Sequence, residues 1–281
     1  MMKNNLAIYC LFFPLFCLNS LIAQTTFVPD QVFEQYLIDN SFDSDGIING
    51  EVLTSDISGI TILDIKAYNI ENFEGLQSFV SLKEFSLTSN LATNIAAISF
   101  AKNSQLTDIF ILNAPGLSGT FVSNNIELVN LQVVTLGDNF YDIDVSNNIN
   151  LVNLSLGNNK LEFLNTDNNV ELKSLLLDGN TIGNIDISKN TKLETLFCRG
   201  CTLLTAVDLN NGVESTVLGS VLLTGNPELT CIKVGSVDNA ETQTGWEKDD
   251  TANFVEDLGP RPDDPLSTSS SEGAFVDATF D

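Results

Sequence analysis

The sequence contains no histidine, and only two of its 281 residues are arginine, Arg199 and Arg261. The absence of histidine excludes histidine-dependent catalytic triads, histidine metal ligands and the usual proton shuttle near neutral pH. The scarcity of arginine leaves little means of clamping a phosphate or a carboxylate with two parallel hydrogen bonds. The chain therefore lacks the side chains on which these kinds of site depend.

Basic residues of either type are few, because 12 lysines and arginines stand against 37 aspartates and glutamates, for a formal charge of -25. Nucleic-acid binding needs clustered basic residues to neutralise phosphates, so this balance argues against it. Hydrophobic residues make up 43% of the chain, which is enough for a packed core. We therefore expect a folded protein with an acidic surface and no nucleic-acid partner.

Long apolar runs are also scarce. The one long run spans residues 6–18 and lies between the charge of Lys3 and the small residue Ala23. It is too short to cross a bilayer and is typical of a secretory signal peptide. We expect residues 1–23 to be removed, with Ser20 as the alternative cleavage position. The mature protein should be secreted or held at the cell surface, with no transmembrane segment.

A repeat with the spacing apolar-x-x-apolar-x-apolar-x-x-Asn runs through residues 56–235. Three copies begin 21 residues apart, at Leu151, Leu172 and Leu193. Five further copies begin at Ile60, Leu82, Leu106, Leu131 and Leu218. The pattern predicts eight coils spaced 20 to 25 residues apart.

This pattern resembles the leucine-rich repeat, whose last position holds Asn or Cys. In the fourth copy we place Leu131, Val134, Leu136 and Asn139 at the four defining positions. Ala114 is one departure from the pattern. The last position holds Asn90, Asn139, Asn159, Asn180, Cys201 and Asn226 in six copies. The resemblance implies a right-handed solenoid of the secreted bacterial type, mostly β and loop, with a parallel sheet on its concave face and a small helical amino-terminal cap.

Within each coil, leucines of a short strand are expected to point inward and to form one continuous core with the neighbouring coils. The closing Asn should turn inward and satisfy backbone groups where the chain bends. The returning halves also repeat, at residues 143–146, 164–167, 185–188 and 207–210, and predict a second short extended segment. A helical turn is expected within 71–81, because Phe73, Leu76 and Phe79 are three residues apart.

Three cysteines would remain after signal cleavage, Cys198, Cys201 and Cys231. An odd number in an exported protein does not indicate a disulfide framework. Cys198 and Cys201 have the Cys-x-x-Cys spacing of redox and zinc sites, but no second cysteine pair accompanies them. Since Cys198 falls on an inward leucine position and Cys201 on the closing position, we expect both to be structural, and we expect no cofactor.

A solenoid needs a cap at each end, because its terminal coils would otherwise expose the core. Residues 24–55 are expected to form the first cap, with a helix that opens at Asp30. Residues 56–258 should hold the coils and a closing cap whose core includes Trp246. Residues 259–281 are expected to be a linker rich in Pro, Ser and Asp, or the start of a further module.

The first cap contains an acidic turn that partly matches an EF-hand calcium loop with Gly46 at its sixth position. Ser41 and Val52 stand where that loop needs oxygen ligands, so the motif is broken at two positions. We expect a plain acidic turn, with calcium as the alternative. The candidate ligands would be Asp43, Asp45, Asn49 and Glu51.

Function is expected on the exposed side of the strands. One exposed residue per strand forms a central column, in which we place Asp64, Ser86, Phe110, Thr135, Ser155, Leu176, Phe197 and Leu222. Leu176, Phe197 and Leu222 should stack as an apolar stripe flanked by Asp178 and Arg199, which is typical of a binding patch. The same stripe could instead serve only to stabilise the sheet.

These features favour a monomeric, non-enzymatic binding module that recognises a protein or a surface glycan through the concave face, at Phe110, Leu176, Phe197, Leu222, Asp178 and Arg199. The alternative is a structural spacer of a larger cell-surface protein. An enzyme is disfavoured because the carboxylates are spread along a regular surface without a nucleophile and base beside them.

Overall fold

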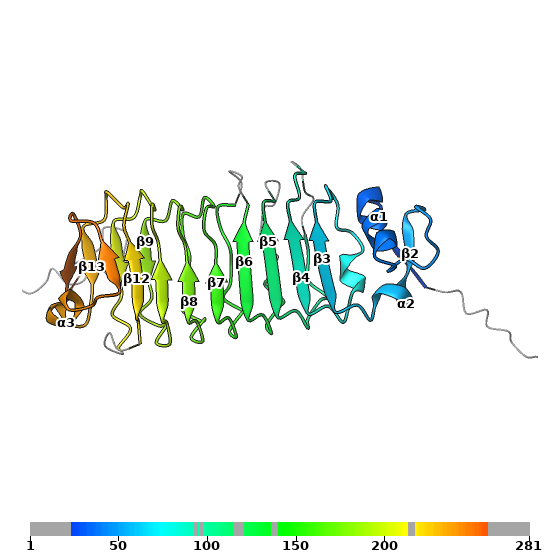
Figure 1. Ribbon diagram of the computed structural model, residues 1–281. Coiled ribbons are helices and arrows are strands. Elements are labelled where there is room, and N and C mark those ends of the chain that lie inside the picture. Colours follow the sequence, from blue (N-terminus) through cyan, green and yellow to red (C-terminus); the bar gives the residue numbers. More distant parts are fainter. Residues whose placement is uncertain are drawn as a thin grey trace, which may run out of the picture.

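The computed structural model describes residues 24–92, 95, 98–114, 121–135, 140–212 and 217–257. These residues wind into an elongated solenoid whose coils stack side by side along one axis (Figure 1). The expected signal peptide at 1–23, the segment 259–281 and Asn139 lie outside the described residues.

One strand from each coil joins a nine-stranded sheet in which every pairing is parallel. Eight of the strands belong to the eight predicted coils, and β14 belongs to the closing cap. In order along the solenoid they are β3 (Ile62–Lys66), β4 (Glu84–Thr88), β5 (Asp108–Leu112), β6 (Asn130–Val134), β7 (Asn153–Ser155), β8 (Ser174–Leu176), β10 (Thr195–Phe197), β12 (Ser220–Leu223) and β14 (Trp246–Lys248). The predicted solenoid with a parallel sheet is confirmed.

The returning halves form a second, shorter parallel sheet of four strands. It consists of β9 (Asn184–Asp186), β11 (Ala206–Asp208), β13 (Cys231–Lys233) and β15 (Asn253–Val255). The extended segments predicted at 185–188 and 207–210 are therefore present as strands, which begin one residue and end two residues earlier than predicted. Residues 143–146 and 164–167 are not assigned as strands, although Ile143 and Val145 point into the core.

The amino-terminal cap combines a small antiparallel pair, β1 (Thr25–Phe27) with β2 (Glu51–Leu53), and two helices, α1 (Gln31–Asp39) and α2 (Thr54–Ile57). The Asp30 side chain caps α1 by accepting from the backbone N–H groups of Val32 and Phe33. Its second oxygen accepts from Glu71 and Asn72, which ties the cap to the first coil.

The predicted helical turn is a 3-10 helix, η1 (Leu76–Ser78), and Phe73, Leu76 and Phe79 are buried around it. At the other end, the closing cap contains α3 (Val237–Glu241). Trp246 is half-buried there, and its indole N–H donates to the carbonyl oxygen of Leu218 at 2.9 Å. No helix in the described ranges is long and apolar enough to span a membrane.

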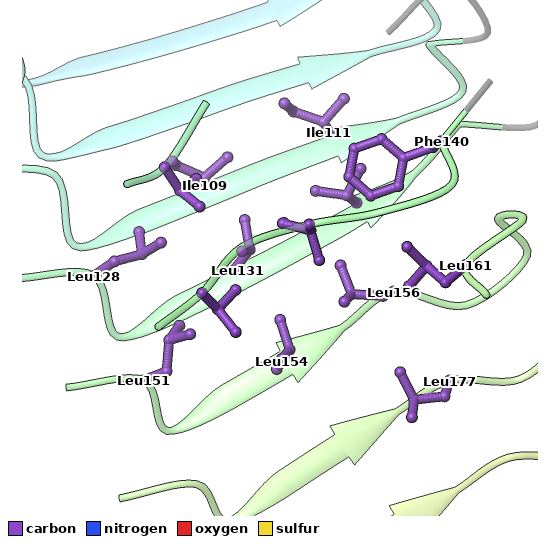
Figure 2. Close-up of a cluster of buried hydrophobic side chains, with 14 of the residues drawn as sticks. Ile109, Ile111, Leu128, Leu131, Phe140, Leu151, Leu154, Leu156, Leu161 and Leu177 are labelled. Atoms are coloured by element: carbon purple, nitrogen blue, oxygen red, sulfur yellow. The ribbon is translucent and has the colours of Figure 1, made fainter. Parts of the chain in front are cut away.

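The predicted register of the fourth coil is wrong by three residues. Leu131 pairs with Ile109 and Leu154, which hold the second apolar position of their copies, not the first. The copy therefore begins at Leu128 and continues through Leu131 and Val133, all of which are buried (Figure 2 labels Leu128 and Leu131). Both frames satisfy the apolar spacing, but only the later frame places an asparagine, Asn139, at the closing position. The correction moves Asn139 out of the closing position of its coil.

The correction also changes the exposed column. Thr135, predicted to be exposed, is buried, and its backbone N–H and hydroxyl both contact the side-chain oxygen of Asn159. Gln132 takes its place, because it pairs with Phe110 on one side and Ser155 on the other. With the fourth copy beginning at Leu128, the eight copies of the repeat begin 21 to 25 residues apart.

Buried asparagines at the ends of four strands link their coils to the preceding coils. The amide of Asn159 donates to the carbonyl oxygens of Val133 and Leu156, both at 2.8 Å. The amide of Asn180 repeats this arrangement with Leu156 and Leu177. We call this row the strand-end ladder; its buried amides are Asn90, Asn159, Asn180 and Asn226.

A second buried asparagine row, absent from the prediction, runs along the returning side. Each amide donates to backbone carbonyls of the preceding coil; Asn148, for example, reaches Val122 at 2.9 Å and Asn125 at 2.8 Å. The spacing Asn-x-x-Leu, which five of the six members of the row have, was the available signal. We call this row the return-side ladder; it consists of Asn103, Asn125, Asn148, Asn169, Asn190 and Asn211.

We expect Asn148→Ala to lower the free energy of unfolding by about 2 kcal/mol, because two carbonyl oxygens in the interior lose a donor. Urea denaturation followed by circular dichroism measures the loss. The neighbouring change Asn147→Ala is the matched control, since Asn147 is exposed and its amide makes one surface hydrogen bond, to Ser123. Equal losses for the two variants would contradict a structural role for the return-side ladder.

Candidate functional site

The outward side chains of the nine-stranded sheet form a regular surface, which we call the sheet face. Its central column follows directly from the strand pairing. From β3 to β14 the column contains Asp64, Ser86, Phe110, Gln132, Ser155, Leu176, Phe197, Leu222 and Glu247. The column is therefore polar at both ends and contains two separate apolar sections.

The larger apolar section consists of Leu176, Phe197 and Leu222. Phe197 on β10 pairs in register with Leu176 on β8 and with Leu222 on β12. Neighbouring strands are about 4.8 Å apart, so the three side chains form a continuous row. Each is half-buried, which leaves part of its apolar surface in contact with solvent.

Phe110 does not belong to this row. It lies on β5, three strands from Leu176 and hence about 14 Å away, with Gln132 and Ser155 between them. Its apolar neighbours are Leu112 on the same strand and Val134, which pairs with Leu112 on β6. Sequence reasoning missed Val134 because the wrong frame of the fourth coil turned it inward. It missed Leu112 because only one exposed residue per strand was considered.

Asp178 and Arg199 flank the larger row as an ion pair. The guanidinium Nε and Nη2 donate to one oxygen of Asp178 at 3.0 and 2.5 Å, while the other oxygen accepts from the Arg199 backbone N–H at 2.7 Å. These contacts raise the pKa of Arg199 above its ordinary value, so it stays charged. The guanidinium also lies 5.4 Å from the centre of the Phe197 ring. The charged pair and the apolar row therefore form one cluster.

A polar row lies beside Phe110 on the same face. The amide of Asn130 donates to Asp108 at 2.5 Å, and the amide of Asn153 donates to Asn130 at 2.6 Å. The hydroxyl of Thr107 occupies the second oxygen of Asp108. This row lies two residues before the central column on each of its three strands, and its hydrogen bonds hold its side chains in place.

A disulfide between Cys198 and Cys201 was not predicted, although both residues were expected to be structural. Cys198 and Cys201 are bonded to each other, and both are fully buried. They hold the inward and closing positions that the repeat assigns to them, and these positions face the same interior within one turn. An odd total of cysteines is uninformative about such a local pair. Cys231, on β13, is a free thiol that is half-buried.

The acidic turn of the first cap uses its candidate ligands mainly to shape the backbone. Asp45 accepts from the Ile47 N–H and from the amide of Asn49, whose own oxygen accepts from the Glu51 N–H. In the part of the chain that the structure describes, no three Cys, Asp or Glu side chains are grouped as metal ligands. Calcium binding by Asp43, Asp45, Asn49 and Glu51 therefore remains an alternative without a preformed cluster of carboxylates.

Asp43 differs from its neighbours because it is buried and one carboxylate oxygen has no hydrogen-bond partner. Burial raises its pKa, and the negative charges of Asp45 and Glu34 act in the same direction. A pKa that is higher in the folded state favours folding at low pH, and this contribution is lost as pH rises through the folded-state value.

We therefore expect Asp43→Asn to raise the melting temperature at pH 7 in the presence of a chelator, with a gain that shrinks towards pH 4. Differential scanning calorimetry across this range measures it. Asp142→Asn, at an exposed position on the solenoid, is the control for the loss of one negative charge and should raise the melting temperature less. A bound calcium ion would reverse the order: millimolar calcium would then raise the melting temperature of the unchanged protein but not of Asp43→Asn.

Comparison with known proteins identifies the fold. No protein-family model matches the sequence, and no curated protein matches it. Among solved structures, an internalin, InlF, of Listeria monocytogenes superposes with a TM-score of 0.54 at 18% identity, covering 83% of this chain and 72% of that one. Internalin C2 of the same organism superposes with a TM-score of 0.55 at 17% identity, covering 83% of this chain and 99% of that one. Together with the eight stacked coils, this likeness shows that the chain has the leucine-rich-repeat fold.

Proposed function

We propose that this protein is a non-enzymatic extracellular binding module that holds a protein partner on its sheet face. The contact would centre on Leu176, Phe197 and Leu222, with Arg199 at its edge. The observation that carries the proposal is that a half-buried apolar row and a fixed cation lie in one cluster. Apolar anchors beside an arginine are the usual composition of an interface hot spot.

The apolar section at Phe110, Leu112 and Val134 would provide a second contact on the same face. A rigid partner could reach both sections, since they are about 14 Å apart and a standard interface is larger than this span. The polar row of Asp108, Asn130 and Asn153 would then lie within the contact. This arrangement supports recognition by a folded surface.

Catalysis is not part of the proposal. Glycoside hydrolysis would need two carboxylates facing each other across a cleft. The carboxylates of the sheet face are instead separated or paired; Asp178 is occupied by Arg199, and Asp108 by Asn130 and Thr107. The turnover of polysaccharides by the purified protein would contradict this reading.

A structural spacer is the second candidate, because the elongated stack of coils would set a fixed distance between whatever is attached at its ends (Figure 1). In that role the apolar row would only stabilise the sheet. The two candidates differ in whether the row is in contact with another molecule.

The test is a pull-down of extracellular proteins by the secreted chain and by a variant with Phe110, Leu176, Phe197 and Leu222 all changed to Ser. We expect capture of a specific partner to fall at least about tenfold in the variant, because the anchors of the contact are removed. Circular dichroism first establishes that the variant is folded.

The matched control changes three exposed apolar residues away from the sheet face, Ile126, Ile149 and Val170, to Ser. They are 52%, 53% and 45% exposed and occupy one column at the turns before the strands. The control should capture the partner as well as the unchanged protein does. Equal capture by all three proteins would place the contact elsewhere, and capture by none would favour the spacer.

A further inference from the structure

The disulfide lies directly beneath the proposed contact. It closes the turn Cys198-Arg199-Gly200-Cys201, so the two bonded residues enclose the arginine that flanks the apolar row. Gly200 has a φ of 66°, a left-handed conformation that suits glycine and turns the chain sharply. Arg199 is exposed while both cysteines are buried, so the bridge holds the inner side of the turn and the guanidinium lies on its outer side.

Two neighbouring coils make the same turn without a disulfide. Their sequences are Asp178-Gly179-Asn180 and Thr224-Gly225-Asn226, and both glycines are left-handed, with φ of 71° and 79°. In each, the closing amide donates to two carbonyl oxygens, one in its own coil and one in the preceding coil. These two hydrogen bonds are what fastens the turn in a standard coil.

The coil of β10 has no closing amide. The sulfur of Cys201 lies 3.3 Å from the carbonyl oxygen of Leu177, where the amide of a standard coil would donate. A disulfide sulfur carries no proton and cannot donate. The cysteine at the closing position therefore replaces the two amide hydrogen bonds of the strand-end ladder by one covalent bond within the turn.

We propose that the Cys198–Cys201 disulfide is a positioning element of the sheet face that replaces the missing ladder amide and holds the Arg199 turn against Asp178 and Phe197. The placement of Arg199 then depends on the oxidation of two thiols, whereas the turns at Asn180 and Asn226 are closed by amides, which are not redox-active. The inference concerns the same site as the proposed function, but the order of the turn can be measured without a partner.

The redox step is simple to balance. The two thiols lose two protons and two electrons to a disulfide oxidant, which becomes a dithiol, and one S–S bond forms. Both sulfurs are buried, so the folded protein shields the bond from a dithiol reductant. Asn226 steadies the turn from the next coil: it accepts from the Cys201 N–H at 2.7 Å, and its amide donates to the Cys198 carbonyl oxygen at 2.8 Å.

The test compares two variants that both lack the bridge and differ only in the closing residue, Cys198→Leu/Cys201→Asn and Cys198→Leu/Cys201→Ala. The first carries the residue types that neighbouring coils have at these positions, so it restores the amide. Limited trypsin digestion measures the order of the turn through the cleavage rate of the Arg199–Gly200 bond. The digests are reduced before mass spectrometry, because the disulfide would otherwise hold together the two fragments produced by a cut between Cys198 and Cys201.

We expect the Ala variant to be cut at Arg199 at least about tenfold faster than the unchanged protein, since local opening governs cleavage. The Asn variant should be cut as slowly as the oxidised protein. The unchanged sequence refolded and kept in dithiothreitol gives the same comparison without substitution, and should behave as the Ala variant does. This second comparison applies even where the Ala variant does not fold.

Equal cleavage of the oxidised protein, the reduced protein and the Ala variant would overturn the proposal, as would fast cleavage of the Asn variant. Partner capture is a separate readout. If the turn responds as expected but no variant changes capture, the positioning role holds and the proposed contact at Arg199 fails. If capture follows the cleavage rates, with rescue by Asn, both hold.

Discussion

Every coil of this protein depends on the coils beside it for the burial of its apolar side chains. A single coil contributes one strand of three to five residues, and the leucines on it are covered only when the next strand pairs in register. The polar groups at the two bends obey the same constraint. In the strand-end ladder and the return-side ladder, amides of one coil donate to backbone carbonyls of the preceding coil. Burial of apolar side chains and hydrogen bonding of buried carbonyls therefore both depend on contacts between neighbouring coils.

This dependence divides the sequence into two sets of positions. Most inward residues are apolar or amide, so they repeat, and the repeat makes the fold visible. Outward residues of the sheet face carry no such demand, and they vary from Ser155 to Phe197 along a single column. Apolar residues in that column are therefore not needed for burial of the core. Their concentration at Leu176, Phe197 and Leu222 is the reason for placing a partner there.

The period of the inward leucines, with the resemblance to the leucine-rich repeat, was sufficient to predict the solenoid and its parallel sheet. The cap helix was predicted separately, from the helix start at Asp30. It was insufficient where two frames were equally apolar, since Leu128 and Leu131 can each start a copy and only strand pairing distinguishes them. The return-side ladder was not predicted, because the prediction used only the asparagine that closes each copy and not the Asn-x-x-Leu spacing. The bond between Cys198 and Cys201 depends on two side chains facing each other across one turn, which spacing alone does not establish.

The disulfide and the proposed contact occur in the same coil, and the fold gives a reason for this coincidence. Each ladder amide donates to a carbonyl of the preceding coil, so the order of a turn depends on the order of the neighbouring coil. A bond that closes within the turn removes this dependence. Arg199 is exposed, long and flexible, and an arginine restrained before binding loses less conformational freedom when a partner arrives. A covalent turn beneath Arg199 would therefore benefit recognition in a way that it would not benefit the turns at Asn180 or Asn226, whose outward residues are Asp178 and Thr224.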